Sequence, residues 1–153
     1  MNDAELNRAL SAFIGLPAAD FVLHREPMQL LDTLVDIGPD FACCEWTVGA
    51  SPFVGAGPGV PMYVGIEMMA QCIAVHAGAR ARVQGLGAPL GFFLGTRHFR
   101  SSVPHFEPGK SYIAECQELV RDSQGMGSFA CNVKLDGECM ATANLAVLEQ
   151  PQQ

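Results

Sequence analysis

A long apolar helix constrains the fold of this chain more than any other feature of the sequence. Residues 63–84 are rich in Met, Ala, Ile and Val, and the segment closes with Arg80, Arg82 and Gly85, as expected at the C-terminal end of a helix. Its apolar side chains run around most of the circumference, and a helix of that kind is buried on all sides. The remaining segments must therefore surround it.

The remaining segments have the composition of β-strands. Their β-branched, aromatic and cysteine residues predict strands over 28–37, 41–48, 91–103, 111–121, 127–135 and 139–148. Asp136-Gly137, between the last two, is a hairpin signal. A capping box of Asn2 and Glu5 predicts a short helix within residues 1–16.

These elements predict an α+β fold in a single domain spanning residues 1–153. An antiparallel sheet of five or six strands would cover one central helix, over residues 63–84. Because such a sheet wraps only part of the helix, we expect its exposed edge to pair with a second copy, giving at least a dimer.

Composition excludes several classes of protein. Hydrophobic residues make up 49% of the chain and charged residues 16%, which excludes intrinsic disorder. A formal net charge of −7 argues against a nucleic-acid binder, since neutralising phosphates needs clustered Lys and Arg. The most apolar stretch, 62–79, is interrupted by Glu67, Gln71 and His76, which a membrane span rarely tolerates. The first residues carry acids and no apolar run typical of a signal peptide, so we expect a cytoplasmic protein without nucleic-acid or membrane partners.

The spacing of cysteines and histidines predicts no metal centre. The six cysteines include no C-x-x-C pair, and we interpret them as small buried hydrophobes in a reducing compartment. No two histidines have the spacing of metal ligands.

Glu67 is the first candidate for a catalytic residue. It lies in the first turns of the apolar helix, where an unpaired charge is expensive. In one interpretation its carboxylate caps free N–H groups or lies near a subunit boundary with access to water. In the other it is a general acid or base, whose pKa is raised by apolar neighbours and lowered by the helix dipole. Gln71, one turn further on, would either orient this carboxylate or bond to a sheet edge.

Gly65 and His24 complete the set of catalytic candidates. Gly65 lies at the helix start, where N–H groups lack intrahelical partners and can hold an oxyanion, or it merely permits a tight turn. His24 lies in a loop just before the first predicted strand.

Several short segments together resemble one protein family. They are Leu-His-Arg-Glu-Pro-Met-Gln-Leu-Leu-Asp at 23–32, Pro-Gly-Val-Pro at 58–61, Glu-Met-Met-Ala-Gln at 67–71, Gly-Phe-Phe-Leu-Gly at 91–95 and the hairpin Asp136-Gly137. In this order and spacing, over roughly residues 17–149, they resemble the hot-dog-fold 3-hydroxyacyl-(acyl-carrier-protein) dehydratases of fatty-acid synthesis. The chain looks most like the small dehydratase-like proteins of aryl-polyene and related type II polyketide pathways.

The resemblance implies dehydration of a 3-hydroxyacyl thioester to the trans-2-enoyl thioester. It implies His24 as the base, Glu67 as the acid and orienter, and a backbone N–H near Gly65 as the oxyanion donor. It implies no metal or organic cofactor, only the phosphopantetheine arm of an acyl carrier protein or CoA. The residues expected at the substrate are Gln71, Pro61, Met62, Phe93, Arg97 and Arg100. The two arginines are candidates for the phosphate of the arm or for an acidic carrier, or they form a solvated strand face.

One departure from the family pattern leaves alternatives open. The fatty-acid dehydratases carry a catalytic histidine just before Pro-Gly-x-Pro, whereas residues 51–57 contain none. Either His24 takes over the imidazole role, or a partner chain supplies it, or this chain is the non-catalytic half of a hetero-oligomer. We therefore expect a homodimer or a heterodimer with another hot-dog protein. A hot-dog thioesterase, in which Glu67 activates water, is the rival enzyme.

Overall fold

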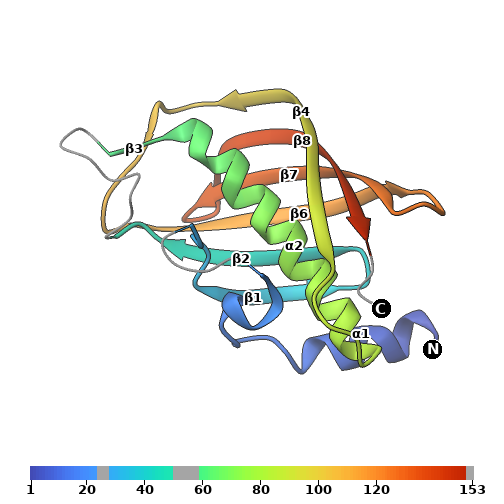
Figure 1. The fold of residues 1–153 in the computed structure, drawn as a ribbon. Helices are drawn as coiled ribbons and strands as arrows, with labels where there is room; N and C mark the ends of the chain where they lie inside the picture. The colour runs from blue at the N-terminus through green and yellow to red at the C-terminus, as the bar shows by residue number, and fades with distance from the viewer. Residues whose placement is uncertain (24–27, 50–58, 151–153) are drawn as a thin grey trace.

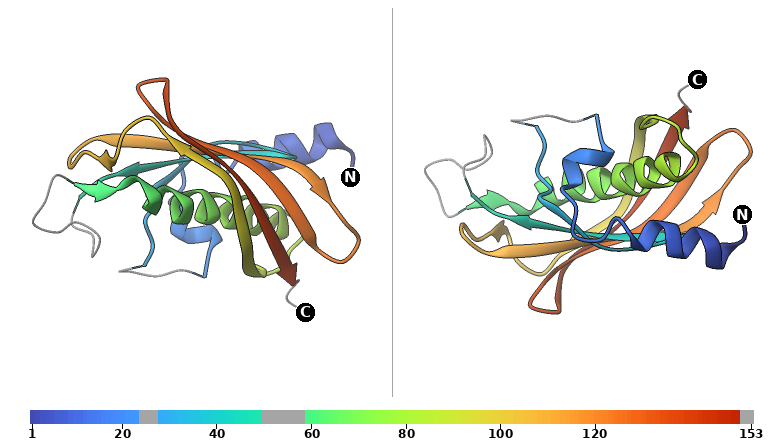
Figure 2. Two further views of the ribbon diagram at one scale, coloured as in Figure 1. Left: turned by 90° about the horizontal axis from the view of Figure 1, so that it is seen from above. Right: turned by 90° about the horizontal axis from the view of Figure 1, so that it is seen from below.

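A six-stranded antiparallel sheet and one long helix form the fold (Figure 1). The computed structural model describes residues 1–23, 28–49 and 59–150. Helix α2 (Gly65–Val83) crosses one face of the sheet, which curves around it (Figures 1 and 2). This is the hot-dog arrangement, so the predicted α+β fold is confirmed. The strands, in their order across the sheet, are β1 (Thr33–Gly38), β2 (Phe41–Thr47), β6 (Ser111–Arg121), β7 (Met126–Leu135), β8 (Glu138–Gln150) and β4 (Leu90–Ser101).

Alternate side chains of the strands point toward α2 and build the core between the sheet and the helix. Ala42, Cys44 and Trp46 of β2 are buried, while the residues between them are partly exposed. Strand β7 repeats the pattern with Phe129 and Cys131. Among residues 1–23, 28–49 and 59–150, no helix combines the length and the apolarity needed to cross a bilayer.

Most of the cysteines belong to this core. Four are buried free thiols: Cys44, Cys72, Cys116 and Cys131. Burial raises the pKa of Cys131, and burial together with the Glu115 carboxylate raises the pKa of Cys43 to about 12. The thiols of Cys131 and Cys43 are therefore protonated at neutral pH.

A close backbone contact fixes a short 3₁₀ helix, η1 (Ala18–Phe21), against α2. A Cβ atom at Gly78 would lie 1.8 Å from the carbonyl oxygen of Phe21, so no other residue fits there without moving the chain. η1 thereby covers a part of α2 that the sheet leaves open (Figure 2).

Several element boundaries differ from the prediction. The N-terminal helix α1 (Asp3–Ser11) has the predicted capping box but ends before residue 16. The central helix begins with a 3₁₀ turn, η2 (Met62–Val64), and its α-helical part is Gly65–Val83 rather than 63–84. Strand β1 begins at Thr33 instead of residue 28, because the backbone at 28–30 bonds to a side chain of α2. A second small sheet was not predicted and pairs β3 (Val60–Pro61) with β5 (His105–Phe106).

Strand β4 ends the sheet order and exposes several apolar side chains. Leu90, Phe92, Phe93 and Leu94 are 44–50% exposed. One backbone edge of a terminal strand has no sheet neighbour to bond. An apolar edge of this length is the kind that another chain normally covers.

Candidate active site

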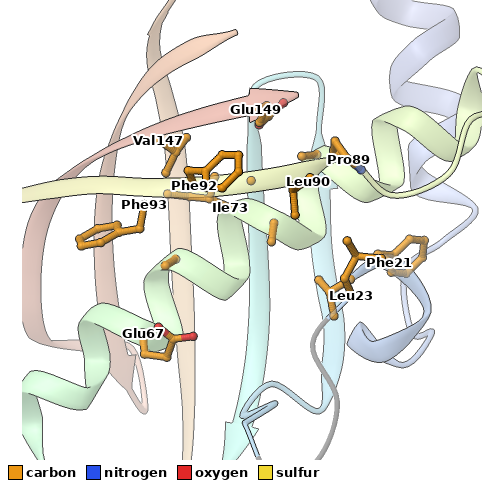
Figure 3. Close-up of a pocket in the computed structure, with 15 residues that line it drawn as sticks. Phe21, Leu23, Glu67, Ile73, Pro89, Leu90, Phe92, Phe93, Val147 and Glu149 are labelled. Carbon is orange, nitrogen blue, oxygen red and sulfur yellow. The ribbon is translucent and has the colours of Figure 1, made fainter. Parts of the chain in front are cut away.

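Glu67 lines an apolar cavity of about 340 Å³ beside α2 (Figure 3). Glu67 lies at one end of this cavity and Glu149 of β8 at the other (Figure 3). Three parts of the chain supply the apolar walls: Phe21, Val22 and Leu23 at the end of η1 and just after it, Ala70, Ile73 and Ala74 on α2, and Leu90, Phe92 and Phe93 on β4. The carboxyl group is thus placed against a surface that fits a hydrocarbon chain.

The buried amide of Gln71 holds the Glu67 carboxylate in place. Its Nε2 donates to Glu67 Oε1 at 3.0 Å and to the carbonyl oxygen of Met28 at 2.7 Å. Its Oε1 accepts from the Leu30 N–H at 2.8 Å. Gln71 is only 1% exposed, so all its polar atoms need partners inside the protein, and these three bonds supply them. One side chain therefore ties the catalytic candidate to the segment that enters β1.

His24 lies outside the described residues, so its predicted role as a base stays a prediction. Its flanking residues, however, meet the Glu67 site from two sides. Leu23 lines the Glu67 cavity, and Met28 accepts a hydrogen bond from Gln71. The two residues that flank this segment thus belong to the cavity wall and to the hydrogen-bond network of Gln71.

The backbone N–H of Gly65 is hydrogen-bonded within the chain. Its N–H donates to the carbonyl oxygens of Met62 and Tyr63, which close the 3₁₀ turn at the start of α2. Gly65 is buried, and an added Cβ atom would lie 3.3 Å from the Phe106 ring, so close packing accounts for glycine here. The predicted oxyanion role of Gly65 requires its N–H to leave these acceptors. Tyr63 and Val64 occupy positions whose N–H groups a helix start leaves without intrahelical partners.

The other predicted substrate residues divide into two groups. Phe93 lines the Glu67 cavity. Pro61 lies in β3, and Met62 is buried with its N–H bonded to Pro104 at 2.8 Å, so neither lines the cavity.

The two arginines lie away from this cavity, on the C-terminal half of β4. Arg97 and Arg100 are exposed and pair with the exposed residues Asn144 and Thr142 of β8, on the sheet face opposite α2. Arg100 borders a separate shallow depression on that face.

Sequence reasoning did not find two of the three cavity walls. Ala70 and Ala74 follow Glu67 by three and seven residues, so helical spacing alone places them on its face. The wall of residues 21–23 carries no such signal, because it depends on the contact at Gly78. In the described part of the chain, no three His, Cys, Asp or Glu side chains are grouped to hold a metal ion.

The sequence is similar to one family model and to known proteins, all of which are described as dehydratases. The sequence model of the family described as ApeP-like, ApeP dehydratase, matches residues 16–153. The 3-hydroxyacyl-(acyl-carrier-protein) dehydratase FabZ of Yersinia enterocolitica is 30% identical over 132 residues, covering 82% of this chain and 77% of that protein. FabZ of Rhizobium rhizogenes is 28% identical over 130 residues, covering 82% and 80%.

Solved structures agree with the sequence relatives. A chain of the dehydratase heterocomplex ApeI:P from Xenorhabdus doucetiae superposes with a TM-score of 0.83 and 29% identity, covering 88% of this chain and 91% of that one. The PaaI protein of Escherichia coli, from a phenylacetic acid degradation operon, shares the fold at 14% identity and a TM-score of 0.58, covering 76% and 78%. The chain belongs to the ApeP-like dehydratase family.

Proposed function

We propose that this protein removes water from a 3-hydroxyacyl thioester to give the trans-2-enoyl thioester in a fatty-acid-like or polyene-forming pathway. The observation that carries the proposal is Glu67 at one end of an apolar cavity, tied through Gln71 to Met28, just after the segment that carries His24. An acyl chain fits the cavity, and the carboxyl group lies where its reacting end would stop.

The reaction needs a base, an acid and an oxyanion donor. His24 takes the proton from the α-carbon, and the electron pair forms the double bond as the 3-hydroxyl leaves. Glu67 protonates that hydroxyl, so water departs and the atoms balance. A backbone N–H at the start of α2 holds the thioester oxygen while it carries charge. Solvent returns the proton from His24 to Glu67 between turnovers.

The thioester is carried by an acyl carrier protein or by CoA, and the chemistry requires no further cofactor. Arg97 and Arg100 are exposed on β4, the strand that also forms a cavity wall. Exposed guanidinium groups there suit an acidic carrier or the phosphate of the pantetheine arm.

A second hot-dog chain would complete the assembly at β4. Its apolar edge is exposed, and the similar Xenorhabdus chain comes from a dehydratase heterocomplex. The partner is either another copy or a related subunit.

A second candidate function is that of a non-catalytic subunit that stabilises an active dehydratase. The specific observation behind it is the absence of histidine from residues 51–57, where the fatty-acid dehydratases carry theirs. The heterocomplex neighbour supports the same alternative.

One assay separates these functions. The purified protein is mixed with a 3-hydroxyacyl-carrier thioester, and products are followed by intact-mass spectrometry. Loss of one water from the acyl group is the expected result. Loss of the whole acyl group would identify a thioesterase. No change alone, with water loss only after a second hot-dog protein is added, would identify the partner subunit.

A further inference from the structure

The outer face of the sheet, on the side away from α2, separates its charges into two halves. Its side chains are those that alternate with the buried residues of the strands. The strands β1, β2 and β6 carry acids on this face, and β7 and β4 carry bases. The acids are Asp36, Glu45 and Glu115, and the bases are Lys134, Arg97 and Arg100. Three negative charges thus lie on one half and three positive charges on the other.

One row of cross-strand neighbours runs across this whole face from an acid to an arginine. Pairing between successive strands places side by side Asp36, Cys43, Glu115, Asn132, Thr142 and Arg100. Neighbouring strands are about 4.8 Å apart, so about 14 Å separates Glu115 from Arg100 along the row, too far for the two charged groups to meet within one chain. A shallow depression of about 500 Å³ lies between them and is bordered by both.

The six charges of the outer face are left without an ion pair in the described part of the chain. Elsewhere Arg80, Arg121 and Lys110 each lie beside a carboxylate of the same chain. Opposite charges stabilise a sheet when they face each other across neighbouring strands. On the outer face they are kept apart instead, so each half is free to attract the opposite half of another molecule.

From this arrangement we propose that the outer face binds a second copy of the same chain, back to back. A two-fold axis that runs along the strands between β6 and β7 exchanges β1 with β4, β2 with β8 and β6 with β7. Each acidic half then covers the basic half of the other copy, and Arg100 of one copy lies over Asp36 of the other. The inference goes beyond the proposed function and does not depend on it.

Apolar side chains and the size of the face support the same contact. Val120 of β6 and Met126 of β7 flank the proposed axis and are 65% and 47% exposed, and the axis brings each close to the other's counterpart. The face measures about 24 Å across the strands and about 24 Å along β2, which gives up to about 600 Å² on each copy. A total of about 1,200 Å² is at the lower end of specific interfaces.

Net charge predicts that this contact depends on salt. Two copies that each carry a charge of −7 repel each other, whereas the outer face is itself neutral, with three charges of each sign. The attraction is therefore local, and added salt screens it.

Sedimentation equilibrium of the full chain, with its partner subunit if one co-purifies, tests the proposal. The assembly at β4 sets the basic unit, and its mass should double as the concentration rises from about 1 to about 100 µM in about 50 mM NaCl. In about 500 mM NaCl the doubling should need at least about 10-fold more protein. No carrier is added, because a carrier would compete for Arg97 and Arg100. A mass that does not double in low salt would overturn the inference.

Two double variants with opposite charge changes sharpen the test. Glu45→Lys with Glu115→Lys makes the face basic, and Arg97→Glu with Arg100→Glu makes it acidic, so each variant alone should associate at least about 10-fold more weakly. An equimolar mixture should recover the doubled mass, which also shows that both variants are folded. Arg8→Glu, on α1, is the control and should keep the doubled mass. Doubling by either variant alone, or none in the mixture, would contradict the proposed contact.

Discussion

The two ends of α2 hold their carboxylates in different ways. Near its N-terminus, Glu67 receives a hydrogen bond from the neutral amide of Gln71 and faces an apolar cavity. Near its C-terminus, Glu118 and Glu149 are bound to arginines that sit between the helix and the sheet. A guanidinium adds an ion pair to a carboxylate, whereas the neutral amide of Gln71 adds a hydrogen bond without a charge. The same helix therefore has a neutral partner and apolar walls around its carboxylate at one end, and charged partners around the carboxylates at the other.

Replacing Glu67 tests the proposed chemistry at the N-terminal end of α2 most directly. Glu67→Gln keeps the shape of the side chain but removes its acidic proton, so turnover should fall by about 10²- to 10⁴-fold. Enoyl formation by mass spectrometry measures the loss, and size-exclusion chromatography checks the assembly. Glu115→Gln, on the outer face of the sheet, is the matched control and should keep its rate. Unchanged turnover in Glu67→Gln would remove the acid role.

Replacing His24 decides where the imidazole comes from. His24→Ala should lower the rate of α-proton removal by at least ~10²-fold, the usual effect of losing a general base. Exchange of α-deuterium from a labelled substrate reports this step separately from the loss of water. A much smaller decrease would mean that a partner chain supplies the base.

Replacing Gln71 links chemistry with folding. Gln71→Leu leaves the buried Leu30 N–H without its partner and removes the bond to the Met28 carbonyl, which should lower the free energy of unfolding by about 1–3 kcal/mol. It also removes one hydrogen bond that positions the Glu67 side chain, so turnover should fall by about 10-fold at a temperature where the variant stays folded. Urea unfolding and steady-state kinetics measure the two effects. Gln117→Leu, which removes two bonds to the exposed Asp40, is the control and should change neither the free energy of unfolding nor turnover by a comparable amount.

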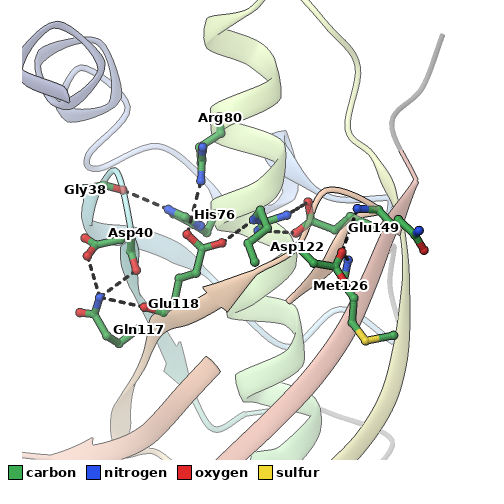
Figure 4. Close-up of polar contacts among 11 residues, drawn as sticks. Gly38, Asp40, His76, Arg80, Gln117, Glu118, Asp122, Met126 and Glu149 are labelled. Carbon is green, nitrogen blue, oxygen red and sulfur yellow. Dashed lines mark hydrogen bonds and ion pairs between the residues drawn. The ribbon is translucent and has the colours of Figure 1, made fainter. Parts of the chain in front are cut away.

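The smallest expected effect is on the pH dependence of stability, through His76 in the C-terminal half of α2. His76 is fully buried, its Nε2 bonds to the Gly38 carbonyl at 3.0 Å, and burial lowers its pKa below the ordinary 6.5 (Figure 4). The unfolded chain therefore binds a proton first, and the free energy of unfolding should decrease as the pH falls below about 6.5. His76→Asn should flatten this dependence in urea unfolding at pH 7.5 and 5.5. An unchanged slope in that variant would assign the effect to other groups.

Local patterns predicted much of the fold and part of the site. The apolar circumference identified the central helix, and the four-residue spacing of Glu67 and Gln71 anticipated their hydrogen bond. The start of β1 was wrong, because a distant side chain captures the backbone at 28–30. The strand-like composition of residues 28–30 gives no sign that their backbone bonds to Gln71 instead of to a neighbouring strand.

Strand β4 shows why the position of the arginines was not predictable. Phe93 and Arg97 are four residues apart, so a regular strand would place both on one face. A register shift between Phe93 and Gly95 inserts an extra residue, which leaves Phe93 beside the cavity and Arg97 opposite Asn144 on the outer face. A second shift between Arg97 and Arg100 includes His98 at a φ of 57°. Such bulges follow from pairing with β8 and leave no mark in the spacing.

The missing side chain at Gly78 gives the protein a way to adjust its cavity from outside it. Phe21 contacts Gly78 with its backbone, and it is also one of the residues that line the cavity. A methyl group at Gly78 would push that backbone outward and carry the wall of residues 21–23 away from α2. The width of the cavity thus depends on a residue that does not line it, and a single added carbon at Gly78 would widen the cavity at the expense of the packing around η1.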